Sequence, residues 1–510
     1  MSHPLASAHL AVSAIILLWD IFLAGQIAGL RAAPRAFAAL TALAGLLAAP
    51  ALLVALAAAS TLYGRAIHGV AWIWPLTLTL FAAQAVYATG RALVTPLIGV
   101  PIAVYDVVIA AAGWAEYALS AGAAPPAWVV TLVAAERSAL AVSVSPAALW
   151  SPVYLYVPAL APSFPPRWRG SAGFRTLVAT FAAAWANAIL IELPIARSAV
   201  RSYDDYADER LQERPRGDFE VGLTVFPDLT GGPPPLSLRN DVALADTIGV
   251  DAIHVVVEPS GATPLGLDSL ARSVDELRRG GARLLVSLGY SAGALAPFRA
   301  TPPLDEAARL RAITRLVRRL RPDYLVPAVE PYGAGARVYG TLPPNAWQGY
   351  FARAAAAAHR VNRRVSVMYV ASAYTARDSV LFAWAASPGS PVDAVGLALA
   401  PSRRGAIGLG ARIAAGERWL RATPSPKETW AFAAALPLTH GEQSQERALW
   451  AAMAWATRQP RVAGIVISEA GDYERQRGLR ASDGRLRPAA LAIRRAAKAL
   501  EEARETAGAQ

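Results

Sequence analysis

The stretch LDEAARLRAITRLVRRLRPDYLVPAVEPYG (residues 304–333) joins an amphipathic helix pattern to a short apolar run. Residues 304–320 carry Ala, Leu and Arg in the pattern of a helix, and YLVPAVE (324–330) is typical of a β-strand. A strand that follows such a helix after a short turn is one unit of a parallel α/β sheet. This strand ends on Glu330, an acid between a valine and a proline.

The same alternation of strand and helix runs through the second half of the chain. Eight candidate strands are EVGLTVF (220–226), AIHVVVE (252–258), RLLVSLG (283–289), YLVPAVE (324–330), RVSVMYV (364–370), AVGLALA (394–400), ETWAFAA (428–434) and AGIVISE (463–469). Eight βα units predict an α/β TIM barrel, written (β/α)8, over residues 219–500, followed by a tail at 501–510. An open doubly wound sheet is the alternative fold. No G-x-G-x-x-G follows the first strand, which argues against a dinucleotide site.

The first 200 residues differ in composition from the rest. The whole chain is 55% hydrophobic and 17% charged, and apolar runs long enough to cross a bilayer core of about 30 Å cluster in this part. Six such segments are residues 9–30, 36–60, 66–90, 92–114, 138–160 and 174–196, the fifth being interrupted by Pro146, Pro152 and Pro158. We therefore expect residues 1–200 to form a polytopic α-helical membrane domain of about six helices.

Arginines indicate how such a domain would be oriented. Those in the loops after the first, third and fifth segments are Arg31, Arg35, Arg91, Arg167, Arg169 and Arg175, whereas Arg65 lies in a loop on the other side. Because positively charged loops stay in the cytoplasm, this distribution predicts a multi-pass protein of the plasma membrane whose C-terminal domain is extracytoplasmic. The polar, charged residues 201–218 are expected to form a juxtamembrane linker between the two domains.

Five polar side chains interrupt the apolar segments: Asp20, Gln84, Asp106, Asn187 and Glu192. Acids inside a membrane are costly and often functional. One interpretation is structural, with Asp20 paired to Arg137 or facing a wet groove. The other interpretation is a transport or lipid-handling site.

Composition argues against several classes of function. The net charge is +12, but the arginines are scattered and not interleaved with aromatic residues, so we expect no nucleic-acid partner. The chain has no Cys, which removes disulfides, zinc–thiolate sites and cysteine nucleophiles. It also contains no H-x-H or H-E-x-x-H motif, no P-loop and no G-x-S-x-G, so neither a catalytic metal nor a cofactor is expected.

In a TIM barrel, catalytic residues lie at the carboxyl ends of the strands. Acids found at or just after those ends are Asp228, Glu258, Glu330 and Glu469, and tyrosines found there are Tyr290, Tyr332, Tyr369, Tyr374 and Tyr473. His254 lies within the second strand. We interpret it as a core histidine whose ring nitrogens are satisfied.

This layout resembles the clan of (β/α)8 retaining glycoside hydrolases that includes cellulase- and mannanase-like enzymes. In that clan an Asn-Glu-Pro at the end of the fourth strand supplies the general acid/base, and VEP matches it here at Glu330 and Pro331. The segment GLRASDGRLRPAALAIRRA (478–496) resembles the clan's ending, in which GL…DG…KPA leads into the last helix. The resemblance implies that Glu330 is the acid/base and that the ligand is a saccharide, on which the five tyrosines would stack.

The chain departs from this pattern at the chemistry. The clan places its nucleophilic glutamate at the end of the seventh strand, where Ala433 stands here. Val329 replaces the Asn before the acid/base, and the tryptophan expected on the eighth strand is missing from IVISEAGDY. Retaining hydrolysis needs two carboxylates about 5–5.5 Å apart.

Three functions are therefore left open for the extracytoplasmic barrel. In the first, Glu330 acts with Glu469, Glu258 or Asp228 as second carboxylate in a glycoside hydrolase. In the second, the barrel is a pseudoenzyme that binds glycans on the cell surface or in the environment. In the third, the barrel is only a structural or assembly domain, and Glu330 is a strand-end acid held by an arginine or a helix N-terminus.

Overall fold

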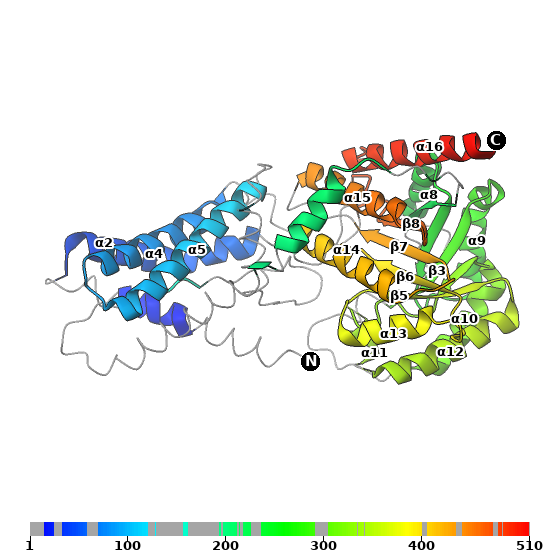
Figure 1. The fold of residues 1–510 in the computed structure, drawn as a ribbon, viewed down its shortest axis with the longest axis horizontal. Helices are drawn as coiled ribbons and strands as arrows, with labels where there is room; N and C mark the ends of the chain where they lie inside the picture. The colour runs from blue at the N-terminus through cyan, green and yellow to red at the C-terminus, as the bar shows by residue number, and fades with distance from the viewer. Residues whose placement is uncertain are drawn as a thin grey trace. The chain divides into compact units, whose positions relative to one another are not determined.

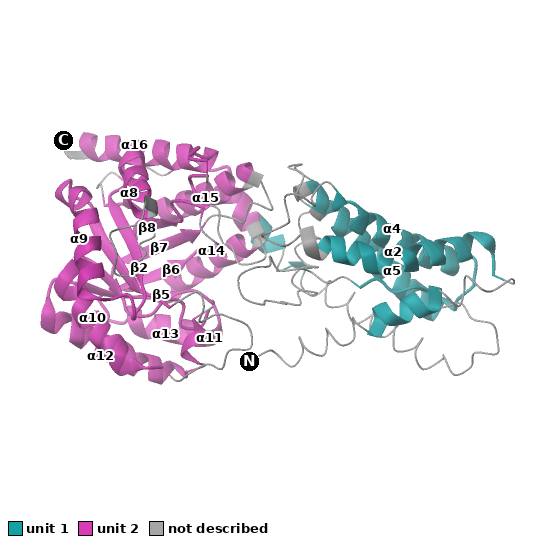
Figure 2. Cartoon of the chain, turned by 180° about the vertical axis from the view of Figure 1, so that it is seen from behind, with its two compact units in different colours: residues 1–200 teal, residues 201–510 magenta. Residues whose placement is uncertain are grey.

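The computed structural model describes residues 15–24, 33–58, 70–120, 128, 157–161, 193–194, 197–211, 214, 218–225, 236–290, 304–333, 335–340, 342–399, 405–434, 441–472, 478–481 and 483–508. The chain forms two compact units, residues 1–200 and 201–510, which Figure 2 distinguishes by colour. The candidate site residues Asp228 and Tyr473 lie outside the described residues. So do Arg137, Asn187 and Glu192 of the first unit.

The first unit is helical. It contains the short helix Ile15–Ala24 and the longer helices α2 (Arg35–Ala58), α4 (Ile73–Gly90) and α5 (Pro96–Ser120), and α4 packs against both α2 and α5. Within the described residues, Arg35–Ala55 and Pro96–Ala115 are long and apolar enough to cross a membrane. A buried core helix or a signal sequence passes the same test, so the six predicted spans stay a prediction. The end of the fifth predicted segment is not helical at residues 157–160, because Pro158 cannot donate to a helical hydrogen bond.

The second unit is a closed barrel of eight parallel strands, which confirms the predicted fold (Figure 1). The strands follow chain order: β1 (Glu220–Val225), β2 (Ala252–Val257), β3 (Arg283–Leu288), β4 (Tyr324–Val326), β5 (Ser366–Ala371), β6 (Ala394–Ala398), β7 (Thr429–Ala434) and β8 (Val462–Ser468). The barrel closes through parallel pairing of β1 with β8. The helices of this unit are α8 (Leu236–Ile248), α9 (Pro264–Arg279), α10 (Glu306–Leu320), α11 (Ala336–Tyr339), α12 (Pro344–Val361), α13 (Ala376–Ala386), α14 (Gly405–Ala422), α15 (Gly441–Arg458) and α16 (Pro488–Gly508).

Helix α10 shows how the sequence sets these elements. Its N-cap residue Asp305 accepts a hydrogen bond from the amide of Ala308 at 2.9 Å, which satisfies one free donor of the first turn. Its buried positions, Ala312, Ile313, Leu316, Val317 and Leu320, recur at helical spacing and face the sheet. The helix ends at Arg321, whose φ of +44° breaks the helical hydrogen-bond pattern.

Side chains fill the inside of the barrel. Tyr324, Met368, Val370, Trp430 and Val466 form one buried cluster there, and small residues make room for the large ones. A Cβ on Gly464 would lie only 2.6 Å from the Trp430 ring. The interior is therefore a packed core, and a ligand can bind only at the ends of the barrel.

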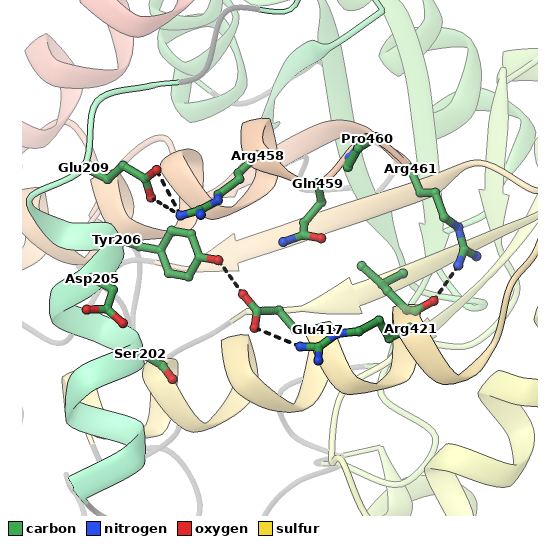
Figure 3. Close-up of a pocket in the computed structure, with 11 residues that line it drawn as sticks. Ser202, Asp205, Tyr206, Glu209, Glu417, Arg421, Arg458, Gln459, Pro460 and Arg461 are labelled. Carbon is green, nitrogen blue, oxygen red and sulfur yellow. Dashed lines mark hydrogen bonds and ion pairs between the residues drawn. The ribbon is translucent and has the colours of Figure 1, made fainter.

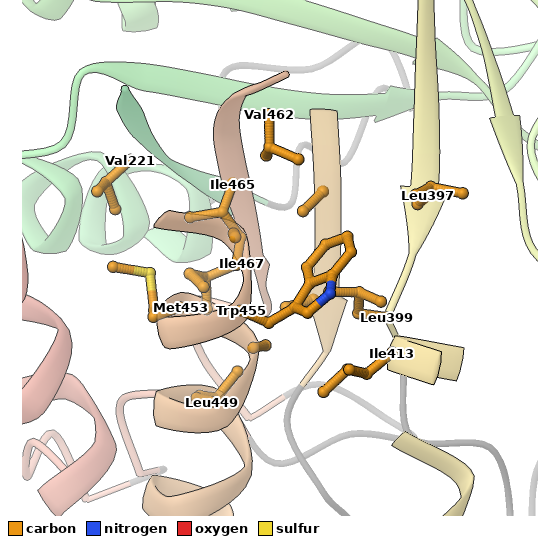
Figure 4. Close-up of a cluster of buried hydrophobic side chains, with 14 of the residues drawn as sticks. Val221, Leu397, Leu399, Ile413, Leu449, Met453, Trp455, Val462, Ile465 and Ile467 are labelled. Carbon is orange, nitrogen blue, oxygen red and sulfur yellow. The ribbon is translucent and has the colours of Figure 1, made fainter. Parts of the chain in front are cut away.

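A second apolar layer lies between the strands and the helices. Figure 4 shows Trp455 of α15 among Leu397, Leu399 and Ile413, and all four side chains are at most 1% exposed. Because both faces of each strand are buried, the strands are apolar on both faces instead of alternating apolar with polar.

The segment predicted as a linker belongs, over residues 201–211, to the barrel unit. Residues 201–207 are helical, and Tyr203 and Tyr206 are only 6% and 7% exposed. The Trp450 indole nitrogen donates to the Glu209 carbonyl at 2.9 Å, and Arg458 pairs with the Glu209 carboxylate at 3.1 Å. The predicted tail is likewise structured, because α16 continues to Gly508 and its Arg504 binds Asp251 at 2.8 Å.

Candidate functional site

Glu330 lies where the carboxyl end of β4 leaves the sheet. Pro327 has no N–H to donate to the sheet, and the strand stops at Val326, before the predicted end. Glu330 then adopts a φ of +49°, a left-handed conformation that non-glycine residues rarely take. Its side chain is partly exposed. Strained residues of this kind cluster at functional sites.

The Glu330 carboxylate lies close to the neighbouring end of β5. A Cβ on Gly333 would lie 3.1 Å from Oε2 of Glu330 and 3.0 Å from Oγ of Ser372. The amide of Gly333 donates to the Glu330 carbonyl at 3.0 Å, which closes a tight turn. A side chain at position 333 would therefore crowd both the carboxylate of Glu330 and the hydroxyl of Ser372.

Asp378 organises the end of β5 and was not among the predicted residues. Its carboxylate accepts hydrogen bonds from the amides of Ser372, Ala373 and Tyr374 at 2.8–3.0 Å, and from the Tyr369 hydroxyl. Burial raises the pKa of Asp378, and these hydrogen bonds oppose that shift. The sequence signal was the cap of α13, in which Thr375 accepts from the amide of Asp378.

Tyr369 does not face the barrel mouth. Met368 and Val370 belong to the cluster inside the barrel, so strand alternation turns Tyr369 outward, towards Phe351 of α12 at 5.4 Å. The side chain is 0% exposed. Tyr369, which the sequence placed among the sugar-stacking tyrosines, therefore lies in the layer between the strands and the helices.

The other described tyrosines lie nearer the mouth. The hydroxyl oxygens of Tyr332 and Tyr374, like Oγ of Ser372, are buried and have no hydrogen-bond partner among the described residues. Burial raises the pKa of Tyr332 to about 12, and the charge of Asp378 adds to the shift. The Tyr374 ring stacks on Trp419 at 5.0 Å. Tyr290 packs edge-on against Tyr339 at 5.8 Å.

Glu469 directly follows β8, after a cis peptide bond with Ser468. Burial raises the pKa of its carboxyl to about 7, and the charges of Asp241 and Asp472 shift it in the same direction. Both neighbours are held by arginines: Arg480 binds Asp241 at 3.1 Å, and Arg487 binds Asp472 at 2.6 Å. Oε2 of Glu469 is buried without a hydrogen-bond partner in the described part of the chain. Glu469 can therefore hold or release a proton near neutral pH.

A chain of hydrogen bonds links four neighbouring strands, β8, β1, β2 and β3. Thr224 Oγ1 lies 2.9 Å from both Ser468 Oγ and His254 Nδ1, and His254 Nε2 lies 2.7 Å from Ser287 Oγ. Burial lowers the pKa of His254 to about 4, so the ring is neutral. His254 is thus a core histidine with both nitrogens satisfied, as the sequence predicted.

The candidate acids come from separated strands. β4 and β8 lie opposite one another in the ring of eight, so Glu330 and Glu469 flank the mouth from two sides. Glu258, after β2, is partly exposed and lies 3.4 Å from the Ser260 hydroxyl. The end of β7 offers Ala433 and Ala434, and no acid follows before Glu442. Among the described residues, no cluster of three or more His, Asp or Glu side chains could hold a metal.

The structure also contains a cavity of about 800 Å³ at the other end of the barrel. Its lining includes Tyr206, Glu417, Arg421 and Arg458, and Arg461, which precedes β8 (Figure 3). Arg458 is paired with Glu209 and Arg421 with Glu417, whereas Arg461 donates to the carbonyls of Leu420 and Thr423. No sequence motif pointed to this place.

Comparison with known proteins identifies no family for the chain. No protein-family model matches the chain, and no curated protein matches it. One similar solved structure is a GH39 enzyme from Xanthomonas axonopodis pv. citri, which is 14% identical over 56% of this chain and 67% of that one, with a TM-score of 0.42. Another is a GH5_18 protein from Streptomyces cattleya in complex with GlcNAc, which is 16% identical over 55% of this chain and 80% of that one, with a TM-score of 0.43. A β-glucosidase from Thermotoga maritima in complex with deoxynojirimycin is 12% identical over 57% of this chain and 99% of that one, with a TM-score of 0.39. At such identities and TM-scores the likeness supports no inference about activity. The fold of the C-terminal unit, a closed barrel of eight parallel strands, is shown by its own strand pairing.

Proposed function

We propose that the barrel binds saccharides at its mouth, with Glu330 as the main polar contact. The observation that carries this proposal is the left-handed φ of +49° at Glu330, combined with a glycine at position 333 whose missing side chain leaves room for the Glu330 carboxylate. Such strain is retained where it holds a side chain in a useful place. A carboxylate at the end of a barrel strand is suited to accept hydrogen bonds from sugar hydroxyls.

Binding without hydrolysis is favoured over retaining catalysis. A retaining mechanism needs a second carboxylate about 5–5.5 Å from the first. The strand that would carry it, β7, ends in Ala433 and Ala434, and alanine cannot form a glycosyl ester. Glu469 stands on β8, across the ring from β4.

A hydrolase is the second candidate, and one observation favours it. The pKa of Glu469 is raised to about 7, which is the range of a general acid or base that works at neutral pH. An inverting enzyme tolerates carboxyl groups about 6.5–9.5 Å apart. In that case Glu330 would be the general acid and Glu469 the second carboxylate. If Glu469 does not reach the sugar, Asp228 or Glu258 would be the second carboxylate.

We further propose that the first unit anchors the barrel in the plasma membrane as a multi-pass domain, with the barrel outside the cytoplasm. Large apolar side chains point outward from its helices: Leu18, Leu46, Leu53 and Leu97 are 65–85% exposed. Polar side chains point inward, since Asp20, Gln84 and Asp106 are at most 1% exposed. This inside-out distribution suits lipid surroundings better than water.

The test measures glycan binding and glycan turnover by the purified full chain, using a panel of soluble oligosaccharides. Glu330→Gln should weaken binding at least about tenfold, the worth of one charge-assisted hydrogen bond. Glu276→Gln is the control, because Glu276 is an exposed acid on α9 and not at a strand end, and it should bind like the wild type. Turnover that disappears in both Glu330→Gln and Glu469→Gln would establish the hydrolase instead. A wild type that neither binds nor cleaves any member of the panel contradicts both functions.

A further inference from the structure

The helices of the first unit enclose a buried piece of non-helical backbone. Residues 157–161 (Val-Pro-Ala-Leu-Ala) form no helix. Val157, Ala159, Leu160 and Ala161 are at most 3% exposed. Backbone N–H and C=O groups removed from water need other partners. In an apolar environment such backbone is tolerated only where protein groups surround it.

Polar side chains from three helices supply these partners. The contacts are Ala159 N to Asp106 Oδ1 (3.1 Å), Leu160 N to Asp20 Oδ1 (3.0 Å), Ala161 N to Gln84 Oε1 (2.8 Å), Gln84 Nε2 to the Ala161 carbonyl (3.0 Å) and the Tyr105 hydroxyl to the Val157 carbonyl (2.9 Å). Gln84 also donates to Thr41 of α2. Three of the five polar residues noted in the sequence therefore converge on one segment.

Each of the two acids uses only one of its oxygens in these contacts. Oδ2 of Asp20 and Oδ2 of Asp106 are buried and have no hydrogen-bond partner in the described part of the chain. The side chains are 1% and 0% exposed. They accept from the amides of two consecutive residues, Ala159 and Leu160, so the two carboxyl groups are neighbours and their charges repel. An asparagine would accept the same backbone hydrogen bonds without a charge. Holding the segment in place does not explain why both residues are acids.

No cation compensates the pair among the described residues. The other charged or titratable groups on these helices lie near helix ends: Arg35 of α2, Tyr87 and the following Arg91 at α4, and Glu116 and Tyr117 of α5. Glu116 is ten residues from Asp106, about 15 Å along a helix. Tyr105, next to Asp106, uses its hydroxyl on the Val157 carbonyl. Two adjacent buried carboxylates cannot both stay ionised in such surroundings unless a cation joins them.

We propose that Asp20 and Asp106 form an occluded site for one monovalent cation, H⁺ or Na⁺, bounded by the segment 157–161. A proton would bind to one of the two Oδ2 atoms. A sodium ion would bind to both, with the carbonyls of Ala159 and Leu160, which accept no hydrogen bond within the described residues, as further ligands. Interrupted helices in membrane proteins present backbone carbonyls and acids to Na⁺ and H⁺ in this way.

The experiment compares the thermal unfolding midpoint of the purified full chain with that of Asp20→Asn and Asp106→Asn. Each protein is measured in NaCl and in choline chloride at equal ionic strength, across a pH series. If the cation is Na⁺, NaCl raises the wild-type midpoint by roughly 2–8 °C in a saturable manner, and the Asn variants lose this effect. If it is H⁺, Na⁺ and choline give equal midpoints. The wild-type midpoint then falls with rising pH more steeply than those of the variants.

A second measurement uses the wild type alone, in case the variants do not fold. An apolar carbodiimide, which reacts with protonated carboxyl groups, is added and the modified residue is located by peptide mass spectrometry. Modification of Asp20 or Asp106 that increases at low pH supports the site, and protection by Na⁺ identifies sodium. Thr77→Val is the control, because the Thr77 hydroxyl donates to the Ile73 carbonyl within α4, and this variant should keep the cation response. The proposal is overturned if the unfolding midpoints of the wild type and the Asn variants respond identically to Na⁺ and pH. If the Asn variants do not fold, it is overturned when the carbodiimide modifies neither aspartate of the wild type and Na⁺ does not change the wild-type midpoint.

Discussion

Two acids at the mouth of the barrel, the buried Asp378 and the partly buried Glu469, have different surroundings. At the β5 side, Asp378 accepts three backbone amides and a tyrosine hydroxyl. At the β8 side, Glu469 has an oxygen with no partner in the described chain and two further acids nearby. Burial raises the pKa of both carboxyl groups. Burial alone therefore does not separate a structural acid from one suited to proton transfer. The number of donors around the acid does.

Asp378→Ala tests the structural side of this comparison and should have the largest effect. The substitution leaves three amides and the Tyr369 hydroxyl without their acceptor in a buried place, so we expect a loss of about 4 kcal/mol in the free energy of unfolding. Pulse proteolysis in a urea series, following the barrel fragment, measures this loss. Asp378→Asn keeps one acceptor oxygen and should cost less than half as much. A loss below about 1 kcal/mol for Asp378→Ala would show that the β5 loop is held by other contacts.

Glu469→Gln tests the β8 side of this comparison through the pH dependence of the free energy of unfolding. The pKa of Glu469 is about 7 in the folded chain, against 4.5 for the free side chain. The folded protein thus holds this proton more tightly, and its stability falls as the pH rises from about 4.5 to about 7. At 1.36 kcal/mol per pKa unit, the total loss is about 3 kcal/mol.

The glutamine side chain of this variant cannot ionise, so the variant should lose less stability than the wild type over this pH range. Urea unfolding at pH 5 and pH 8 measures the difference between the two proteins. Glu220, at the base of the barrel, also has a pKa raised to about 7 by burial despite its pairing with Arg283. It is present in both proteins and cancels from the comparison. Equal pH profiles would mean that solvent reaches Glu469.

The sequence predicted the barrel well and the site only in part. Seven of the eight predicted strands overlap the observed ones almost completely, because the buried strands are apolar runs separated by amphipathic helices. The fourth stops early at Pro327. Since both strand faces are apolar, the pattern could not tell that Tyr369 points away from the mouth.

Other features depend on contacts between distant residues. Asp378 lies on a helix, and its role appears only when the β5 loop folds around it. The sequence identified Asp20, Gln84 and Asp106 as unusual, but not that Asp20 accepts a hydrogen bond from Leu160, 140 residues away. No local pattern encodes such a contact.

Glu330→Gly, with the smallest expected effect, separates function from stability at the mouth. Glycine adopts positive φ readily, so relief of the strain at φ +49° should stabilise the barrel by about 1 kcal/mol while saccharide binding is lost. Arg321→Gly is the matched control, because Arg321 has a φ of +44° at the end of α10, where no ligand is expected. It should give a similar gain in urea unfolding and leave binding unchanged. If Glu330→Gly instead destabilises the barrel, the contacts of the Glu330 side chain stabilise the fold by more than the backbone strain costs. The main role of Glu330 would then be structural.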